Sequence, residues 1–156
     1  MGVKYPEELM DFPEYISIEE VKRVCDQLGI RDWTELSKAE VELREAEIIR
    51  GLVGGEALDV SVEEFQQGLE VELEHGIGFS DANASNNHPV LTGKIVLAHL
   101  KESLDYYTRL EVAELEGDLF KAVLSGDQAK LASKYQKLLE ARFLLSEREN
   151  AQTKSA

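Results

Sequence analysis

Apolar residues recur every three to four positions along most of the chain, a spacing typical of α-helices that bury one side. Val21, Val24 and Cys25, for example, share one side of the first such segment. No segment shows the strict alternation of a half-buried strand. The pattern predicts an all-α fold, a compact helical bundle of five or six helices. The expected helical segments are residues 17–30, 37–52, 61–75, 90–102, 105–124 and 127–149.

Three of these segments begin with a capping box, in which a serine side chain and a glutamate side chain three residues later each accept from the other's backbone amide. The predicted boxes are Ser17 with Glu20, Ser37 with Glu40, and Ser61 with Glu64. The first and third starts are almost identical in sequence. Two explanations are possible. The chain contains a weak internal repeat, or the two helices independently use the same residue types to begin.

Gly76 is expected to end the third helix, because glycine commonly terminates helices. Residues 77–89, rich in Gly, Asn and Ser, then predict a structured loop. The next segment is apolar on nearly all sides, which predicts a central helix with His99 largely buried. We expect one helical domain over residues 1–156, with N-terminal helices at 17–52, an appended C-terminal helix at 127–149 and a frayed end after it.

The net charge of the chain and its cysteine content argue against some classes of function. The 31 acidic and 17 basic residues give a formal net charge of −14, which argues against a broad basic face for nucleic acid and favours a basic protein partner. Cys25 is the sole cysteine, so no internal disulfide can form, and a reducing compartment fits best. The N-terminus has no recognisable export signal and no segment is apolar enough to span a bilayer. We therefore expect a cytoplasmic protein without membrane contact, and we expect Cys25 in the core.

Two histidines have a glutamate three residues away on the same side of a helix. The pairs Glu72 with His75 and His99 with Glu102 can each present a nitrogen and an oxygen to a transition-metal ion, as in helical bundles that hold di-iron centres. The alternative is a core histidine that bonds its helical neighbour, with no metal. No cofactor is the leading expectation.

Residues 81–87 alternate oxygen-bearing side chains like the start of a calcium loop, but Asn86 stands where such a loop needs glycine and Thr92 where it needs an acid. We therefore favour side chains that fold the loop onto itself.

A cluster at the start of the fifth segment predicts a structural corner. Asp105 can cap the helix, Arg109 can pair with Asp105 one turn later, and Tyr106 and Tyr107 can pack on either side. These four residues would fix the angle between two helices. A ligand or partner site is the alternative.

Between Glu72 and Leu110 the sequence carries ELEHG, an Asn-rich loop ending in Pro89, TGKIVLAHLKE and DYYTRL. This string resembles an uncharacterised domain family of unknown function found in bacteria and tailed phages, with the likeness specific over about 60–115. The resemblance implies a compact helical domain and brings no activity with it. Its hallmark positions match Glu74, His75, Gly76, Pro89, Thr92, Gly93, Lys94, His99, Leu100, Glu102, Tyr106, Tyr107 and Arg109.

The sequence departs from that pattern in three places. Ser103-Leu104 replaces a proline that often precedes the Asp-Tyr-Tyr run, a helix is inserted between Ile30 and Val60, and a long helix follows Leu124. The additions indicate a specialised member with an extra partner surface.

The leading functional hypothesis is a non-enzymatic accessory protein, of phage or bacterial origin, that binds another macromolecule through its acidic helical surface or its C-terminal helix. No complete catalytic set is visible in the sequence, and an appended amphipathic helix suits association, including self-association. The alternatives are a metal-binding helical domain that uses the His/Glu pairs and an acidic mimic of nucleic acid.

Overall fold

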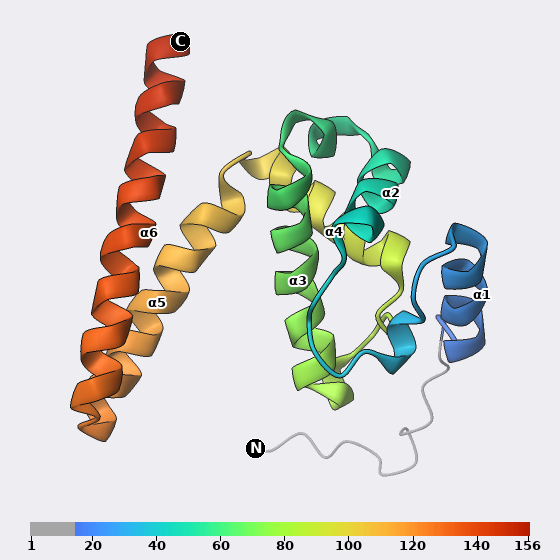
Figure 1. Ribbon diagram of the computed structural model, residues 1–156, viewed down its shortest axis with the longest axis horizontal. Coiled ribbons are helices and arrows are strands. Elements are labelled where there is room, and N and C mark those ends of the chain that lie inside the picture. Colours follow the sequence, from blue (N-terminus) through green and yellow to red (C-terminus); the bar gives the residue numbers. More distant parts are fainter. Residues whose placement is uncertain (1–14) are drawn as a thin grey trace, which may run out of the picture. The chain divides into compact units, whose positions relative to one another are not determined.

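The computed structural model describes residues 15–156, and this part of the chain contains six α-helices, three short 3₁₀ helices and no strands (Figure 1). The prediction of an all-α fold with five or six helices is confirmed. The α-helices are α1 (Ile18–Leu28), α2 (Leu43–Val53), α3 (Val62–Gly78), α4 (Pro89–Glu102), α5 (Tyr106–Ser125) and α6 (Gln128–Ser155). The 3₁₀ helices are η1 (Trp33–Glu35), η2 (Gly55–Asp59) and η3 (Ser80–Ala82).

Helix α1 begins and ends as the sequence predicts. The Ser17 hydroxyl accepts a hydrogen bond from the amide of Glu20 at 3.2 Å. Glu20 does not complete the box, because its carboxylate binds Arg23 instead. Gly29, in a left-handed conformation with φ of 64°, closes the helix. Cys25 lies buried on the inner side, and burial raises the pKa of its thiol, so the prediction of a core cysteine is confirmed.

The predicted start of the second helix at Ser37 is wrong, because α2 begins at Leu43 and uses a different pair of residues. The amide of Glu42 donates to the Glu45 carboxylate at 3.0 Å. The preceding residues stay extended because α3 binds their backbone: the amide of Val41 donates to Glu70, and its carbonyl accepts from Gln66. Hydrogen bonds to side chains more than twenty residues away therefore keep this segment extended, although Ser37 and Glu40 have the spacing of a capping box.

Helix α3 has the complete capping box predicted for Ser61 and Glu64, with bonds of 3.1 Å in both directions. Its end differs from the prediction. Gly76 lies inside the helix, which continues to Gly78, and its lack of a side chain serves close packing rather than termination.

The chain divides into two compact units, and the boundary falls within α4 after Val96. The N-terminal unit comprises the described residues to Gly54 together with Ser61–Val96. Its core contains Trp33, Ile49 and Phe65, which are fully buried. Helix α4 packs closely on α2 there, since a Cβ atom on Gly93 would lie 2.5 Å from Ile49 Cγ2.

The C-terminal unit comprises Gly55–Val60 and Leu97–Ala156. Its main feature is a hairpin in which α5 and α6 lie side by side and antiparallel (Figure 1). Gly126 is left-handed at the turn, and Asp127 caps α6 through the amide of Lys130. Helix α6 continues to Ser155, so the prediction of a frayed end after residue 149 is wrong. None of the described helices combines the length and apolar character that crossing a bilayer requires.

Candidate functional site

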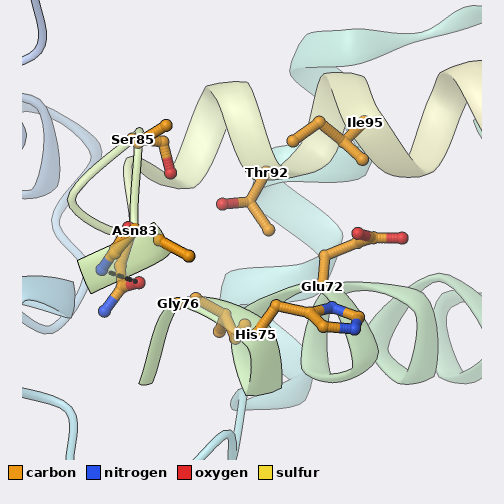
Figure 2. A pocket seen from close by; sticks show the side chains of 11 residues that line it. Glu72, His75, Gly76, Asn83, Ser85, Thr92 and Ile95 are labelled. Atoms are coloured by element: carbon orange, nitrogen blue, oxygen red, sulfur yellow. Dashed lines mark hydrogen bonds between the residues drawn. The ribbon is translucent and has the colours of Figure 1, made fainter. Parts of the chain in front are cut away.

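A cleft of about 270 Å³ opens in the N-terminal unit between α3, the loop with η3, and the first half of α4. Figure 2 shows Glu72 and His75 on the α3 wall, with Thr92 and Ile95 facing them from α4. Asn83 and Ser85 close the end formed by the loop. Glu72 and His75, which the sequence singled out, therefore line one cleft with Asn83 and Ser85, which the sequence placed in a loop, and with Thr92, which it placed in the following helix.

The loop that closes the cleft is held by its own asparagine side chains. The Asn83 amide donates to Asn87 Oδ1 at 3.0 Å, and the Asn87 amide donates to the carbonyl of Trp33 at 3.3 Å. Asn86 reaches the carbonyl of Ile16 at 2.7 Å. Asn86 and Asn87 both have positive φ, which asparagine tolerates better than most residues. The Asn83–Asn87 bond folds the loop onto itself, as the favoured interpretation expects, and the other two bonds tie the loop to Ile16 and Trp33.

Gly76 lets α3 approach this loop closely. A Cβ atom at this position would lie 2.5 Å from Asn87 Oδ1 and 3.1 Å from Asn83 Cγ. Any larger residue would displace the asparagines that shape the cleft.

His88 sets the start of α4, a role that sequence reasoning missed. Its Nδ1 accepts from the amides of Val90 and Leu91 at 3.2 and 3.3 Å, which makes it the cap of a helix whose first residue is Pro89. The signal was present in the sequence, because proline favours the first helical position and the residue before it is then the cap. Thr92 adds a bond from its hydroxyl to the carbonyl of His88 at 2.8 Å.

Burial lowers the pKa of His88 below its ordinary value of 6.5, more than the nearby carboxylate of Glu20 raises it. Arg23 and Lys94 act in the same direction as burial. The ring is therefore neutral at pH 7, as an accepting Nδ1 requires.

The four predicted metal ligands lie in two separate pairs. Glu72 and His75 belong to the N-terminal unit, whereas His99 and Glu102 belong to the C-terminal unit, with 3.9 Å between His99 Nδ1 and Glu102 Oε2. Across residues 15–156 no group of three or more His, Cys, Asp or Glu side chains is placed to hold a metal ion. Each pair on its own supplies two ligands, fewer than the three protein ligands that catalytic zinc sites use.

The predicted corner in the C-terminal unit does form an ion pair. The Arg109 Nε and Nη2 atoms donate to the two Asp105 oxygens, each at 2.9 Å. The Asp105 side chain is only 1% exposed. Burial alone raises its pKa, but the bonds from Arg109 and Ser103 outweigh burial and hold the pKa below its ordinary value of 3.8. Asp105 occupies the cap position of α5 yet makes no side-chain bond to the helix backbone, so the predicted cap is wrong.

Helix α6 completes this corner from the far end of the chain. Glu149 binds Arg109 Nη1 at 2.9 Å, and Gln152 donates to Asp105 at 3.4 Å. One turn further along α5, Arg148 donates to the Thr108 hydroxyl at 2.7 Å. The appended helix is therefore an integral part of the corner, which local spacing could not predict.

Tyr106 and Tyr107 both pack beside His99. The rings of His99 and Tyr106 stack with centroids 4.1 Å apart, and Tyr107 meets His99 edge-on at 6.1 Å. The side chain of His99 is 29% exposed, so it is mostly covered but is not a core residue. The stack nevertheless ties the end of α4 to the start of α5, as a structural corner requires.

Comparison with known proteins identifies one family. The model of the family described as "Protein of unknown function (DUF5661)" matches residues 21–116, more than half of the chain. The match includes the cleft and the start of α5 and ends before α6. No curated protein and no solved structure matches.

Proposed function

The chain belongs to the DUF5661 family, and we propose that it is a non-enzymatic accessory protein that binds a basic segment of another protein in the cleft of its N-terminal unit. The cleft would take a lysine or arginine side chain of that partner. We place this activity in the cytoplasm, because the lone, buried Cys25 suits a reducing compartment.

The observation that carries the proposal is the charge of the cleft and its surroundings. Among residues 15–156, Glu72 and His75 are the ionisable residues that line the cleft, and no lysine or arginine of this part of the chain lines it. Helix α3, which bears both residues, has five glutamates and no lysine or arginine. A concave surface with charge of one sign concentrates ligands of the opposite charge.

The neutral lining groups favour a ligand that donates hydrogen bonds. Thr92 uses its hydroxyl proton on the carbonyl of His88, and Asn83 uses its amide nitrogen on Asn87. Their oxygens keep acceptor capacity, which suits an ammonium or guanidinium group. Leu73 and Ile95 supply apolar wall against which the aliphatic stem of such a side chain can pack.

The test is a titration of the full chain with a fluorescent arginine-rich peptide, with a glutamate-rich peptide of equal length as the negative control. Glu72→Gln should weaken binding about tenfold, equivalent to ~1.4 kcal/mol. Glu74→Gln is the matched control, because Glu74 is exposed on the same helix and does not line the cleft. It removes the same charge and should change affinity less than Glu72→Gln.

Equal losses for the two variants would show that the peptide recognises the general negative field of α3 rather than the cleft. Absence of binding to the basic peptide at low salt, where surface electrostatics are strongest, would refute the proposal.

A further inference from the structure

The backbone of His88 joins the loop wall of the cleft to its α4 wall. The His88 amide donates to the carbonyl of Ser85 at 3.0 Å, and the His88 carbonyl accepts from the amide and the hydroxyl of Thr92 at 2.9 and 2.8 Å. Ser85 and Thr92 both line the cleft (Figure 2). A shift of the His88 backbone would therefore move lining residues on two walls at once.

The His88 ring holds this backbone in place through one nitrogen atom. Nδ1 accepts from the amides of Val90 and Leu91 at 3.2 and 3.3 Å, an arrangement that we call the capped state. An imidazole nitrogen accepts hydrogen bonds only while it carries no proton. His88 is 8% exposed, so the packed ring has little room to turn. A proton on Nδ1 would therefore leave an N–H group facing two other N–H groups.

The charged groups around His88 give a protonated ring little support. From α1, Glu20 attracts a proton on the ring and Arg23 repels it, and from α4 Lys94 also repels it. The Glu20 carboxylate is already paired, because Arg23 Nε and Nη2 donate to its two oxygens at 2.7 and 2.6 Å. On the loop side, the contact is with the uncharged Ser85. The ring also lies at the positive end of the α4 dipole, which disfavours a cation.

We propose that protonation of His88 releases the basic ligand from the cleft, so that binding there is sensitive to acid. This inference rests on the proposed function, because it concerns the same cleft and the same ligand. The ligand binds the capped state, in which the neutral ring holds both walls. When the ring takes up a proton, the first turn of α4 from Pro89 to Leu91 opens. The His88 backbone then no longer keeps Ser85 and Thr92 at the spacing that the ligand needs.

The direction of the pH effect follows from linkage. Burial, Arg23 and Lys94 together lower the pKa of His88 below 6.5 in the capped state. The capped state is therefore fully favoured above pH 6.5, and ligand affinity falls as the pH falls through 6.5 towards the folded-state pKa. An arginine-rich ligand keeps its charge throughout this range. His75 needs a separate control, because it lines the cleft and a proton on it would repel the ligand directly.

The test is a titration of the full chain with the fluorescent arginine-rich peptide at about pH 7.5 and about pH 5.5, at constant ionic strength, where carboxylates remain mostly ionised. The measured quantity is the ratio of the two Kd values, so each variant is its own reference. The wild type should bind about tenfold more weakly at the lower pH. His88→Asn supplies a cap acceptor that does not titrate, and its loss should be less than about threefold.

His75→Asn is the matched control, because it makes the same replacement at the histidine that lines the cleft. It should keep most of the wild-type loss. If the loss instead disappears in His75→Asn and persists in His88→Asn, release comes from charge inside the cleft and the inference is wrong.

A measurement without the peptide tests the opening of α4 directly. In NMR spectra of the free chain, the amide signals of Val90 and Leu91 should shift with pH along the titration curve of the His88 ring. The amide of Ile49, in the buried part of α2, should not follow that curve. The shifts at Val90 and Leu91 should be absent in His88→Asn.

Equal Kd ratios in the wild type and His88→Asn, or first-turn amides that do not follow the ring, would overturn the inference while leaving peptide binding at neutral pH in place. Failure of the proposed function gives a different result. The peptide then fails to bind at both pH values, and the inference about its release falls with the proposed function.

Discussion

The N-terminal unit and the α5–α6 hairpin differ in how far they bury their large apolar side chains. Among the described residues, all but two of the largest fully buried side chains belong to the N-terminal unit, and Leu138 and Asp105 are the two in the C-terminal unit. The hairpin instead exposes Phe120 and Phe143, each by more than 60%. Both regions show similar helical periodicity in the sequence.

The periodicity of apolar residues therefore predicts which faces of the helices are apolar, but it does not predict what covers those faces. In the N-terminal unit, α2, α3 and α4 cover one another, with Gly93 allowing the closest approach. In the hairpin, one face of each helix is covered by the other helix and a second face is left over. The first region therefore has a well-covered core of its own, whereas the second leaves large apolar side chains exposed.

The largest expected effect comes from truncating one phenylalanine in each region. Phe65→Ala should lower the free energy of unfolding by about 3–5 kcal/mol, because Phe65 is fully buried and its removal leaves a cavity. Phe120→Ala should stay within about 0.5 kcal/mol in dilute solution, because Phe120 is mostly exposed. Urea unfolding measures both variants, and similar losses would contradict the contrast between the two regions.

The second-largest loss of stability is expected when a buried carboxylate of the N-terminal unit loses its partner. Glu45 is 1% exposed and binds Arg31 Nε at 3.0 Å and Nη2 at 2.6 Å. Arg31→Ala leaves this charge buried with backbone amides alone and should cost about 3 kcal/mol at neutral pH. The exposed pair of Arg23 and Glu20 provides the control, since Arg23→Ala should have no measurable effect.

The pH profile of the same variant should be flatter than that of the wild type. Burial alone raises the pKa of Glu45, but its bonds to Arg31 and to two backbone amides bring the pKa below 4.5. The wild-type contribution is thus present above pH 4.5 and is lost as the pH falls through the folded-state pKa. Arg31→Ala removes the strongest single bond that lowers this pKa, so the folded-state pKa should rise and the variant should lose less stability on acidification than the wild type does. A variant with the wild-type pH profile would show that Arg31 does not set the ionisation of Glu45.

Interactions within one helical turn were the part of the fold that the sequence could predict. The bond from the Glu20 amide to Ser17, the box at Ser61 and the pair of Asp105 with Arg109 all connect residues three or four positions apart. Such pairs depend mainly on helix geometry. The prediction of a helix start at Ser37 failed because Glu70 and Gln66 bind the backbone of Val41. The spacing of neighbouring residues cannot predict such distant contacts.

The candidate site could be predicted only in part for the same reason. The sequence singled out Glu72 and His75, whose spacing is local. It could not predict that Asn83, Ser85 and Thr92 would face them, because the cleft depends on how α3, the loop and α4 pack. The capping role of His88 was the exception, since the His-Pro pair already carried the signal.

A smaller effect is expected in the N-terminal unit where α4 begins. His88→Ala removes the acceptor of two backbone amides and should cost about 1 kcal/mol, whereas His88→Asn supplies another acceptor and should cost less. The depressed pKa of His88 also predicts a pH effect. The contribution of His88 is present above pH 6.5 and is lost as the pH falls through 6.5 towards the folded-state pKa.

Thermal unfolding between about pH 5 and 7 measures this loss, which His88→Asn should abolish. The exposed His75 is the matched control, because His75→Asn should leave the pH dependence in place. Equal pH dependence in the wild type and His88→Asn would assign the effect to another group.

The smallest effect should come from two glycines at the end of α3, and it separates a tightly packed position of the N-terminal unit from an open one. Gly78→Ala should raise stability by about 0.5 kcal/mol, because a Cβ atom there meets nothing within 4 Å and alanine restricts the unfolded chain. Gly76→Ala should act in the opposite direction, because its Cβ would press on Asn87, which the carbonyl of Trp33 holds in place. The urea midpoints of the two variants should therefore fall on either side of the wild type. A rise for both would show that the asparagine loop yields easily, and the cleft would then lack the rigid wall that selective binding of a basic side chain requires.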